Sequence, residues 1–127
     1  MANEISLSVN MSVAKGSLRY QFSPPPATIT LLGNAAAGGV QNISTSTEAL
    51  LLVDVTTRGM ANFVNLSTGT KVQLGTWDGT TYHPFGQLNA GEPAVLRLSA
   101  SSGTSPVARV IEPTNGTANI QWQVFSE

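Results

Sequence analysis

The residues best suited to chemistry in this chain lie together between positions 77 and 83. Trp77, Asp78, Tyr82 and His83 surround one Asp-Gly turn signal, and His83 is the only histidine. An exposed aromatic ring beside an aspartate can bind a sugar, because the ring stacks on the pyranose and the carboxylate accepts its hydroxyl hydrogens. The same residues fit a structural role, in which Trp77 and Tyr82 face each other across a β-hairpin. Both interpretations of this loop stay open from the sequence.

The sequence shows no pattern typical of an active site. A serine-type triad needs a nucleophile at a sharp turn, and the chain has no Gly-x-Ser-x-Gly motif to accompany His83. The acidic residues lie far apart, so nothing pairs two of them for glycoside hydrolysis. No phosphate-binding loop, dinucleotide fingerprint or metal-ligand spacing occurs, and there is no cysteine. We therefore expect a protein that is not an enzyme and that holds no metal and no cofactor.

Composition favours β-structure and gives no support to nucleic-acid or membrane partners. Only 10% of the residues are charged, whereas 27 of the 127 are Ser or Thr, which compete with helical hydrogen bonding. The six basic residues are scattered and the net charge is −1, whereas nucleic-acid binding relies on clustered cations. No signal-like segment opens the chain and no apolar run is long enough to span a bilayer. We expect synthesis in a cytoplasm and no membrane segment.

Residues 4–13 alternate polar and apolar side chains without a break, which predicts one long N-terminal strand. Its apolar face consists of Ile5, Leu7, Val9, Met11 and Val13. Gly16 then marks a turn and residues 17–22 alternate again, which is typical of a β-hairpin. Because an apolar stripe of this length would aggregate in water, we expect it to be buried against the domain core or a neighbouring subunit.

Short alternating runs follow at spacings of about 8–12 residues, separated by turn residues. The hydrophobic run 49–55 predicts a strand buried on both faces, with a helical turn over residues 50–52 as the alternative, and the small residues 33–39 predict a loop. The pattern as a whole predicts a single all-β domain over residues 1–127, an antiparallel β-sandwich that is jelly-roll-like. Residues 1–16 would form its extended N-terminal strand, or arm, and a turn.

Five strand-and-turn segments follow one another in a recognisable order, beginning with Met-Ser-Val-Ala-Lys-Gly-Ser-Leu: Met11–Leu18, Thr45–Leu50, Asp54–Leu66, Val72–Gly75 and Leu88–Leu98. In this order they resemble small virion proteins of tailed bacteriophages, which are commonly taken as head decoration (cement) proteins. The resemblance implies a jelly-roll-like sandwich that binds the major capsid protein on the outside of a phage head, as a homotrimer. Residues 24–26 and 33–39 depart from the pattern.

Two functions of different classes follow from the sequence. The first is a structural virion protein that binds the outside of a capsid and stabilises it, located on the virion surface and attached through the apolar N-terminal residues. The alternative is a carbohydrate- or receptor-binding β-sandwich module of a virion or cell surface, which would use Trp77, Asp78, Tyr82 and His83.

Overall fold

The computed structural model describes residues 4–50, 55, 57–98, 105–111 and 116–126. Over these residues the chain forms twelve strands and no helix, and all the strand pairings are antiparallel. The predicted all-β antiparallel fold is therefore confirmed. The chain divides into two compact units, residues 1–32 and residues 33–127.

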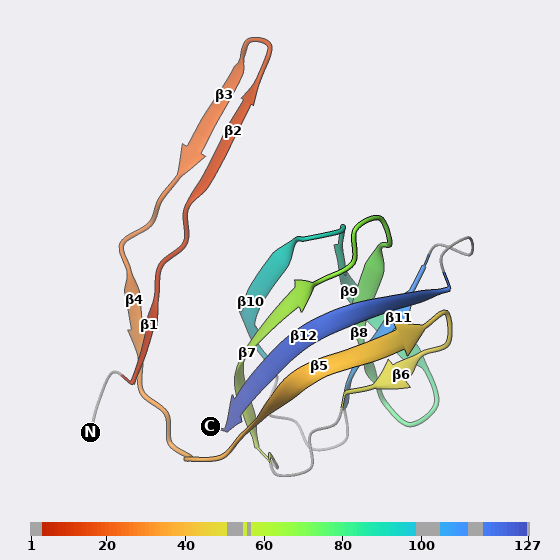
Figure 1. Cartoon of the computed structure of the whole chain (residues 1–127). Helices are drawn as coiled ribbons and strands as arrows, with labels where there is room; N and C mark the ends of the chain where they lie inside the picture. The colour runs from red at the N-terminus through yellow and green to blue at the C-terminus, as the bar shows by residue number, and fades with distance from the viewer. Residues whose placement is uncertain (1–3, 51–54, 56, 99–104, 112–115, 127) are drawn as a thin grey trace. The chain divides into compact units, whose positions relative to one another are not determined.

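The first unit is a long β-hairpin built from two short ladders (Figure 1). Strand β1 (Ile5–Leu7) pairs with β4 (Ala27–Ile29), and β2 (Met11–Lys15) pairs with β3 (Leu18–Phe22). Gly16 lies in the two-residue turn between β2 and β3 with φ of 57°, a conformation that glycine adopts without steric cost. The predicted hairpin is confirmed, and its return limb extends the unit beyond the expected arm of residues 1–16.

The N-terminal strand is interrupted, although its alternation predicts one continuous strand. Residues 8–10 lie outside any strand, opposite residues 23–26 of the return limb. That part of the return limb contains Pro24, Pro25 and Pro26, which have no N–H group to donate to a ladder. The alternation fixes which side chains share a face, but the partner limb decides where a ladder can form.

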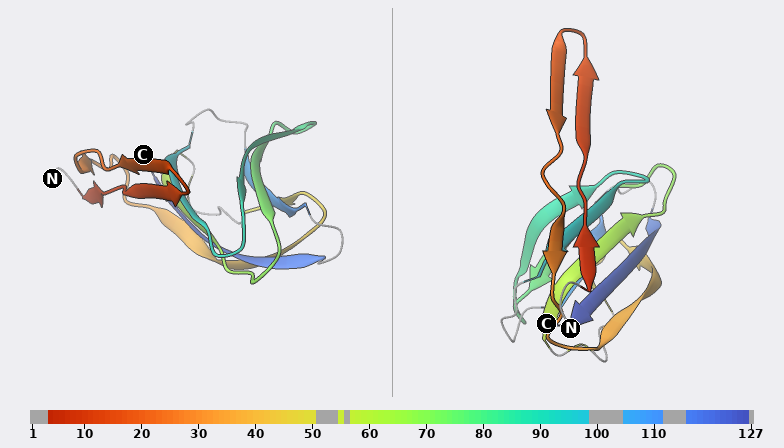
Figure 2. Two further views of the ribbon diagram at one scale, coloured as in Figure 1. Left: turned by 90° about the horizontal axis from the view of Figure 1, so that it is seen from above. Right: turned by 90° about the vertical axis from the view of Figure 1, so that its left-hand side faces the viewer.

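The second unit is a sandwich of two four-stranded antiparallel sheets (Figures 1 and 2). One sheet has the order β10-β7-β12-β5 and the other has the order β6-β11-β8-β9. Their bounds are β5 Ala36–Ser44, β6 Glu48–Ala49, β7 Arg58–Asn65, β8 Val72–Trp77, β9 Tyr82–Leu88, β10 Pro93–Arg97, β11 Ser105–Val110 and β12 Thr117–Ser126.

The core between the two sheets is formed by alternate residues of their strands. It includes inward-facing side chains of β12 and β8: Ile120, Trp122, Val124, Val72 and Leu74. Burying each large apolar side chain is worth about 1.5–3 kcal/mol, so this cluster is the main source of stability. Leu50 and Val55 belong to the same cluster. They flank residues 51–54 of the predicted buried strand 49–55, and those four lie outside the described residues.

Residues 36–39 belong to strand β5, so the prediction of a loop over residues 33–39 was wrong for this part. Strand β5 pairs with β12 from Ala36, opposite Phe125, to Ser44, opposite Thr117. A Cβ atom at Gly38 would lie 2.6 Å from the carbonyl oxygen of Trp122. Glycine here therefore allows two backbones to approach closely.

Candidate functional site

The first unit places its apolar side chains on one face of each ladder. Residues directly opposite each other in an antiparallel pair share a face. One face of β2–β3 therefore carries the aliphatic stem of Lys15 and five large apolar side chains: Met11, Val13, Leu18, Tyr20 and Phe22. In β1–β4 the pairs of Ile5 with Ile29 and of Leu7 with Ala27 give an apolar face in the same way. We call these two faces together the apolar hairpin face.

Much of the apolar hairpin face is open to solvent. Exposure is 48% for Met11, 52% for Tyr20 and 44% for Phe22, and Leu18 is exposed as well. Of the five residues predicted from the sequence, Ile5, Leu7 and Val13 are half-buried, Met11 is exposed, and Val9 lies between the ladders and is 44% exposed. The contribution of the return limb to this face was not predicted from the sequence, although the alternation of residues 17–22 was the signal for it.

Among the described contacts, side-chain hydrogen bonds are found at the two ends of the hairpin. At the base, the backbone N–H of Leu31 donates to Oε2 of Glu4 at 3.1 Å. At the tip, Nη1 of Arg19 donates to the carbonyl oxygens of Gly16 and Leu18, at 3.0 and 3.2 Å. The Glu4 contact joins the two limbs at the base, and the Arg19 contacts lie within the turn and β3. None of them places a charge in the middle of the apolar hairpin face. The face is suited to binding another apolar surface.

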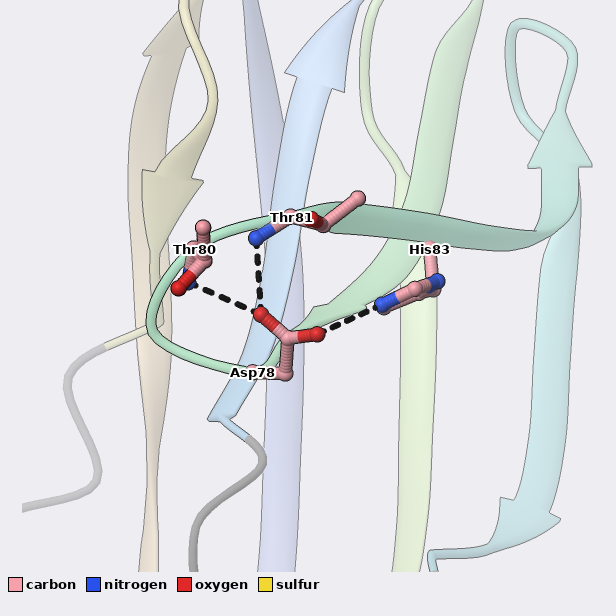
Figure 3. Close-up of polar contacts among 4 residues, drawn as sticks. All are labelled: Asp78, Thr80, Thr81 and His83. Carbon is pink, nitrogen blue, oxygen red and sulfur yellow. Dashed lines mark hydrogen bonds and ion pairs between the residues drawn. The ribbon is translucent and has the colours of Figure 1, made fainter.

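Asp78 organises the turn between β8 and β9. Its Oδ1 accepts hydrogen bonds from the backbone N–H groups of Thr80 and Thr81, at 2.8 and 2.7 Å (Figure 3). Its Oδ2 lies 2.9 Å from Nε2 of His83. The contact with His83, followed by the two backbone N–H groups, lowers the pKa of Asp78 to about 2. Both carboxylate oxygens are thus engaged within the turn.

The residues of the proposed ligand loop come together in this hairpin, but they occupy opposite faces of it. Trp77 is paired with Tyr82, and Thr76 is paired with His83. Because successive residues of a strand point to opposite faces, the aromatic pair lies on one face and His83 on the other. Trp77 is 38% exposed. A pyranose stacked on Trp77 would therefore be on the far side of the hairpin from His83.

The Tyr82 side chain of β9 contacts residues of β8 and β11, the next two strands of its sheet. Its ring lies over Gly75, where a Cβ atom would come within 2.5 Å of the ring carbon Cε2. Cζ of Arg109 is 4.6 Å from the ring centroid, and Nε of Arg109 donates to Oε1 of Gln73 at 3.1 Å. Burial raises the pKa of Tyr82, and the nearby Arg109 opposes that rise. This cluster was not predicted from the sequence, because Arg109 of β11 is distant in sequence from Tyr82. The one sign of the cluster in the sequence was Gly75, a glycine inside an alternating strand.

Other carboxylates bind backbone N–H groups close to them in the same way. Oε1 of Glu48 accepts from the N–H of Ser44 at 2.8 Å, and Oε2 of Glu92 accepts from the N–H of Asn89 at 2.8 Å. The bonds from Asn89 lower the pKa of Glu92. Among the described residues there is no group of three or more His, Cys, Asp or Glu side chains that could hold a metal ion. The described part of the chain contains no helix able to cross a membrane.

Comparison with protein-family models, curated proteins and solved structures finds no match to this chain. Its function is therefore inferred from its own residues and their geometry.

The carboxyl group of Asp78 is expected to titrate with a midpoint near pH 2. The usual value is about 4, so the stability that the ionised group contributes is complete above pH 4 and is lost as the pH falls through 2. Carbon-13 NMR of the side-chain carboxyl measures the midpoint directly. His83→Ala should raise it, because His83 is the largest cause of the shift. A wild-type midpoint near 4, or one that His83→Ala leaves unchanged, would contradict this account of the turn.

Proposed function

We propose that this chain is a structural virion protein that binds the outside of a phage capsid and stabilises it. Its sandwich would be jelly-roll-like, its partner would be the major capsid protein, and it would act as a homotrimer on the virion surface. The observation that carries the proposal is the apolar hairpin face, which belongs to a 32-residue unit. The order of strand-and-turn segments that resembles phage decoration proteins supports the same role.

Binding to a partner would stabilise the hairpin. An isolated two-stranded hairpin is marginally stable in water, and three or more strands or a packed face are usually needed. Large exposed apolar patches mark interaction sites in soluble proteins. A partner that covers Met11, Tyr20 and Phe22 would remove this surface from water and order the hairpin. Binding of this kind stabilises the assembled state by mass action, which is how a decoration protein reinforces a shell.

Negative charge on the apolar hairpin face is expected to dissociate the homotrimer. Leu7→Asp together with Met11→Asp places two carboxylates in the contact, and each costs several kcal/mol if it stays ionised and unpaired. At low micromolar concentration, light scattering should give three times the chain mass of 13.2 kDa for the wild type and one chain mass for the double variant. Phage heads that lack a decoration protein should co-sediment with the wild type only.

The matched control is Ser6→Asp with Ser12→Asp. It adds the same charge to the same limb but on the opposite faces of the ladders, where Ser6 pairs with Thr28 and Ser12 with Gln21. This variant should remain trimeric and bind heads. A wild-type protein that is monomeric at micromolar concentration contradicts the trimer. Equal behaviour of the two double variants contradicts the role of the apolar hairpin face.

A further inference from the structure

We propose that the free edge of strand β5 pairs with β5 of a second copy of this chain, so that two sandwiches join through a continuous antiparallel ladder. This contact is separate from the apolar hairpin face and does not depend on the proposed function. It is carried by the backbone groups at the edge, by the absence of protection there, and by the self-complementary sequence of the strand.

The even-numbered residues of β5 turn their backbone groups away from the sheet. Strand β5 ends the order β10-β7-β12-β5, and so only one of its edges is paired by a described strand. The carbonyl of Asn119 in β12 accepts from the N–H of Leu66, on the side of β12 that faces β7. Asn119 and its register partner Asn42 therefore do not exchange backbone hydrogen bonds, and the backbone groups of Asn42 point away from β12. At the end of the strand, the N–H of Ser44 donates to Glu48 rather than to β12.

Since backbone groups alternate in direction along an antiparallel strand, the same orientation holds at every second position before Asn42. Four residues with this orientation are exposed: Ala36, Gly38, Val40 and Asn42. Strand β5 therefore presents an open row of donors and acceptors to a new strand.

The other three edges of the sandwich carry features that discourage pairing, whereas on β5 the described contacts cover the outward backbone groups of only the last residue, Ser44, with the Glu48 carboxylate. Strand β6 has only two residues and includes Glu48. Strand β9 contains Pro84 and has a register shift beside it, and β10 begins at Pro93 and ends at Arg97. Short length, proline, bulges and charge are the usual means by which proteins block edge-to-edge association. Strand β5 has nine residues with no charge and no proline.

A second copy of β5 fits this edge because the strand is complementary to itself. Without charged side chains, two copies can meet antiparallel with no like charges opposed, around a two-fold axis. If Gly39 of each copy lies opposite Gly39 of the other, all four outward-facing residues form backbone hydrogen-bonded pairs across the contact. This register sets Ala36 opposite Asn42 of the partner subunit, and Val40 opposite Gly38 of the partner subunit. Val40 is 61% exposed in the single chain, and the glycine opposite leaves room for its side chain.

The test is sedimentation velocity on the full chain over a micromolar-to-millimolar concentration series. It is run with the wild type and again in the Leu7→Asp, Met11→Asp background, which separates this contact from the apolar hairpin face. We expect the sedimentation coefficient of both to rise with concentration. In the Leu7→Asp, Met11→Asp background, Val40→Lys should abolish the rise through charge repulsion. Val40→Pro should abolish it by removing one outward N–H, since an edge strand tolerates proline where its N–H faces solvent.

Val95→Lys is the matched control, because Val95 is an exposed valine at 49% on the edge strand β10. It adds the same charge to another edge and should leave the association intact. Absence of association in the Leu7→Asp, Met11→Asp background overturns the proposal, and so does association in that background that Val40→Lys and Val40→Pro leave unchanged.

Disulfide capture tests the identity and register of the partner strand, because the chain has no cysteine of its own. Ala36→Cys mixed with Asn42→Cys should give a cross-linked dimer, since residues opposite in a hydrogen-bonded pair have Cα atoms about 5.5 Å apart. Each variant alone should cross-link far less, because identical positions are then distant. An association that Val40→Lys removes but that gives no mixed cross-link would place a different strand on this edge, and would overturn the pairing of β5 with itself.

Discussion

Replacing Asn65 by alanine is expected to lower the free energy of unfolding by about 3–5 kcal/mol. The Asn65 side chain is fully buried at the end of β7. Its Nδ2 donates to the carbonyl oxygens of Thr70 and Leu88, at 2.7 and 3.1 Å, and its Oδ1 accepts from the N–H of Ser67 at 3.0 Å. Alanine would remove these bonds from Leu88 and Ser67 and would leave the Thr70 carbonyl only the Ser67 hydroxyl at 2.8 Å; each buried group left unsatisfied costs about 1–3 kcal/mol. Urea denaturation followed by tryptophan fluorescence measures the change.

Two further variants separate lost hydrogen bonds from lost packing. Asn65→Asp keeps the shape but turns an oxygen toward the two carbonyl oxygens that now receive Nδ2, so it should destabilise at least as much as alanine. Asn119→Ala removes an exposed side chain whose only described hydrogen bond is to the Asn42 side chain, at 2.9 Å, and should cost less than about 1 kcal/mol. Equal losses for Asn65→Ala and Asn119→Ala would show that the buried network contributes little.

Gly75→Ala is expected to destabilise the sandwich by about 1–3 kcal/mol, through overpacking rather than through backbone conformation. The added Cβ would lie 2.5 Å from the Tyr82 ring and 2.6 Å from the carbonyl oxygen of His83. The ring could move, but the carbonyl belongs to the neighbouring strand. Displacing the ring should also expose Tyr82, so that its raised pKa falls toward the ordinary value, a change that absorbance titration can follow.

Gly86→Ala is the control for this prediction. Gly86 lies on the adjacent strand β9, and a Cβ there would have no heavy atom within 4 Å. The substitution should change the free energy of unfolding by less than about 0.5 kcal/mol. A similar loss at both glycines would mean that strand propensity, and not the contact with Tyr82, controls the effect.

The sequence by itself determined the class of fold and several of its hairpins. The alternation of Ile120, Trp122 and Val124 with polar residues matches the buried and exposed faces of β12, because a period of two follows from strand geometry alone. Gly16 fixed the turn of the first hairpin for the same local reason, since glycine alone adopts its backbone angle at no cost. The Trp77–Tyr82 pairing was one of two interpretations that the sequence left open, and the register places these residues opposite each other.

Only the tertiary structure decided which segments meet. From the sequence alone, small residues such as Gly38 predict a loop, but in the structure β12 lies against them. The two cases look alike in the sequence, because glycine occurs both in turns and where two backbones approach closely. The alternation of residues 4–13 could not show that prolines on the return limb would interrupt the ladder. The same limit applies to Arg109 on Tyr82 and to the hydrogen bond from the Asn65 side chain to the Leu88 carbonyl. Local patterns specify faces and turns, whereas contacts between segments distant in sequence depend on how the strands order themselves in the sheets.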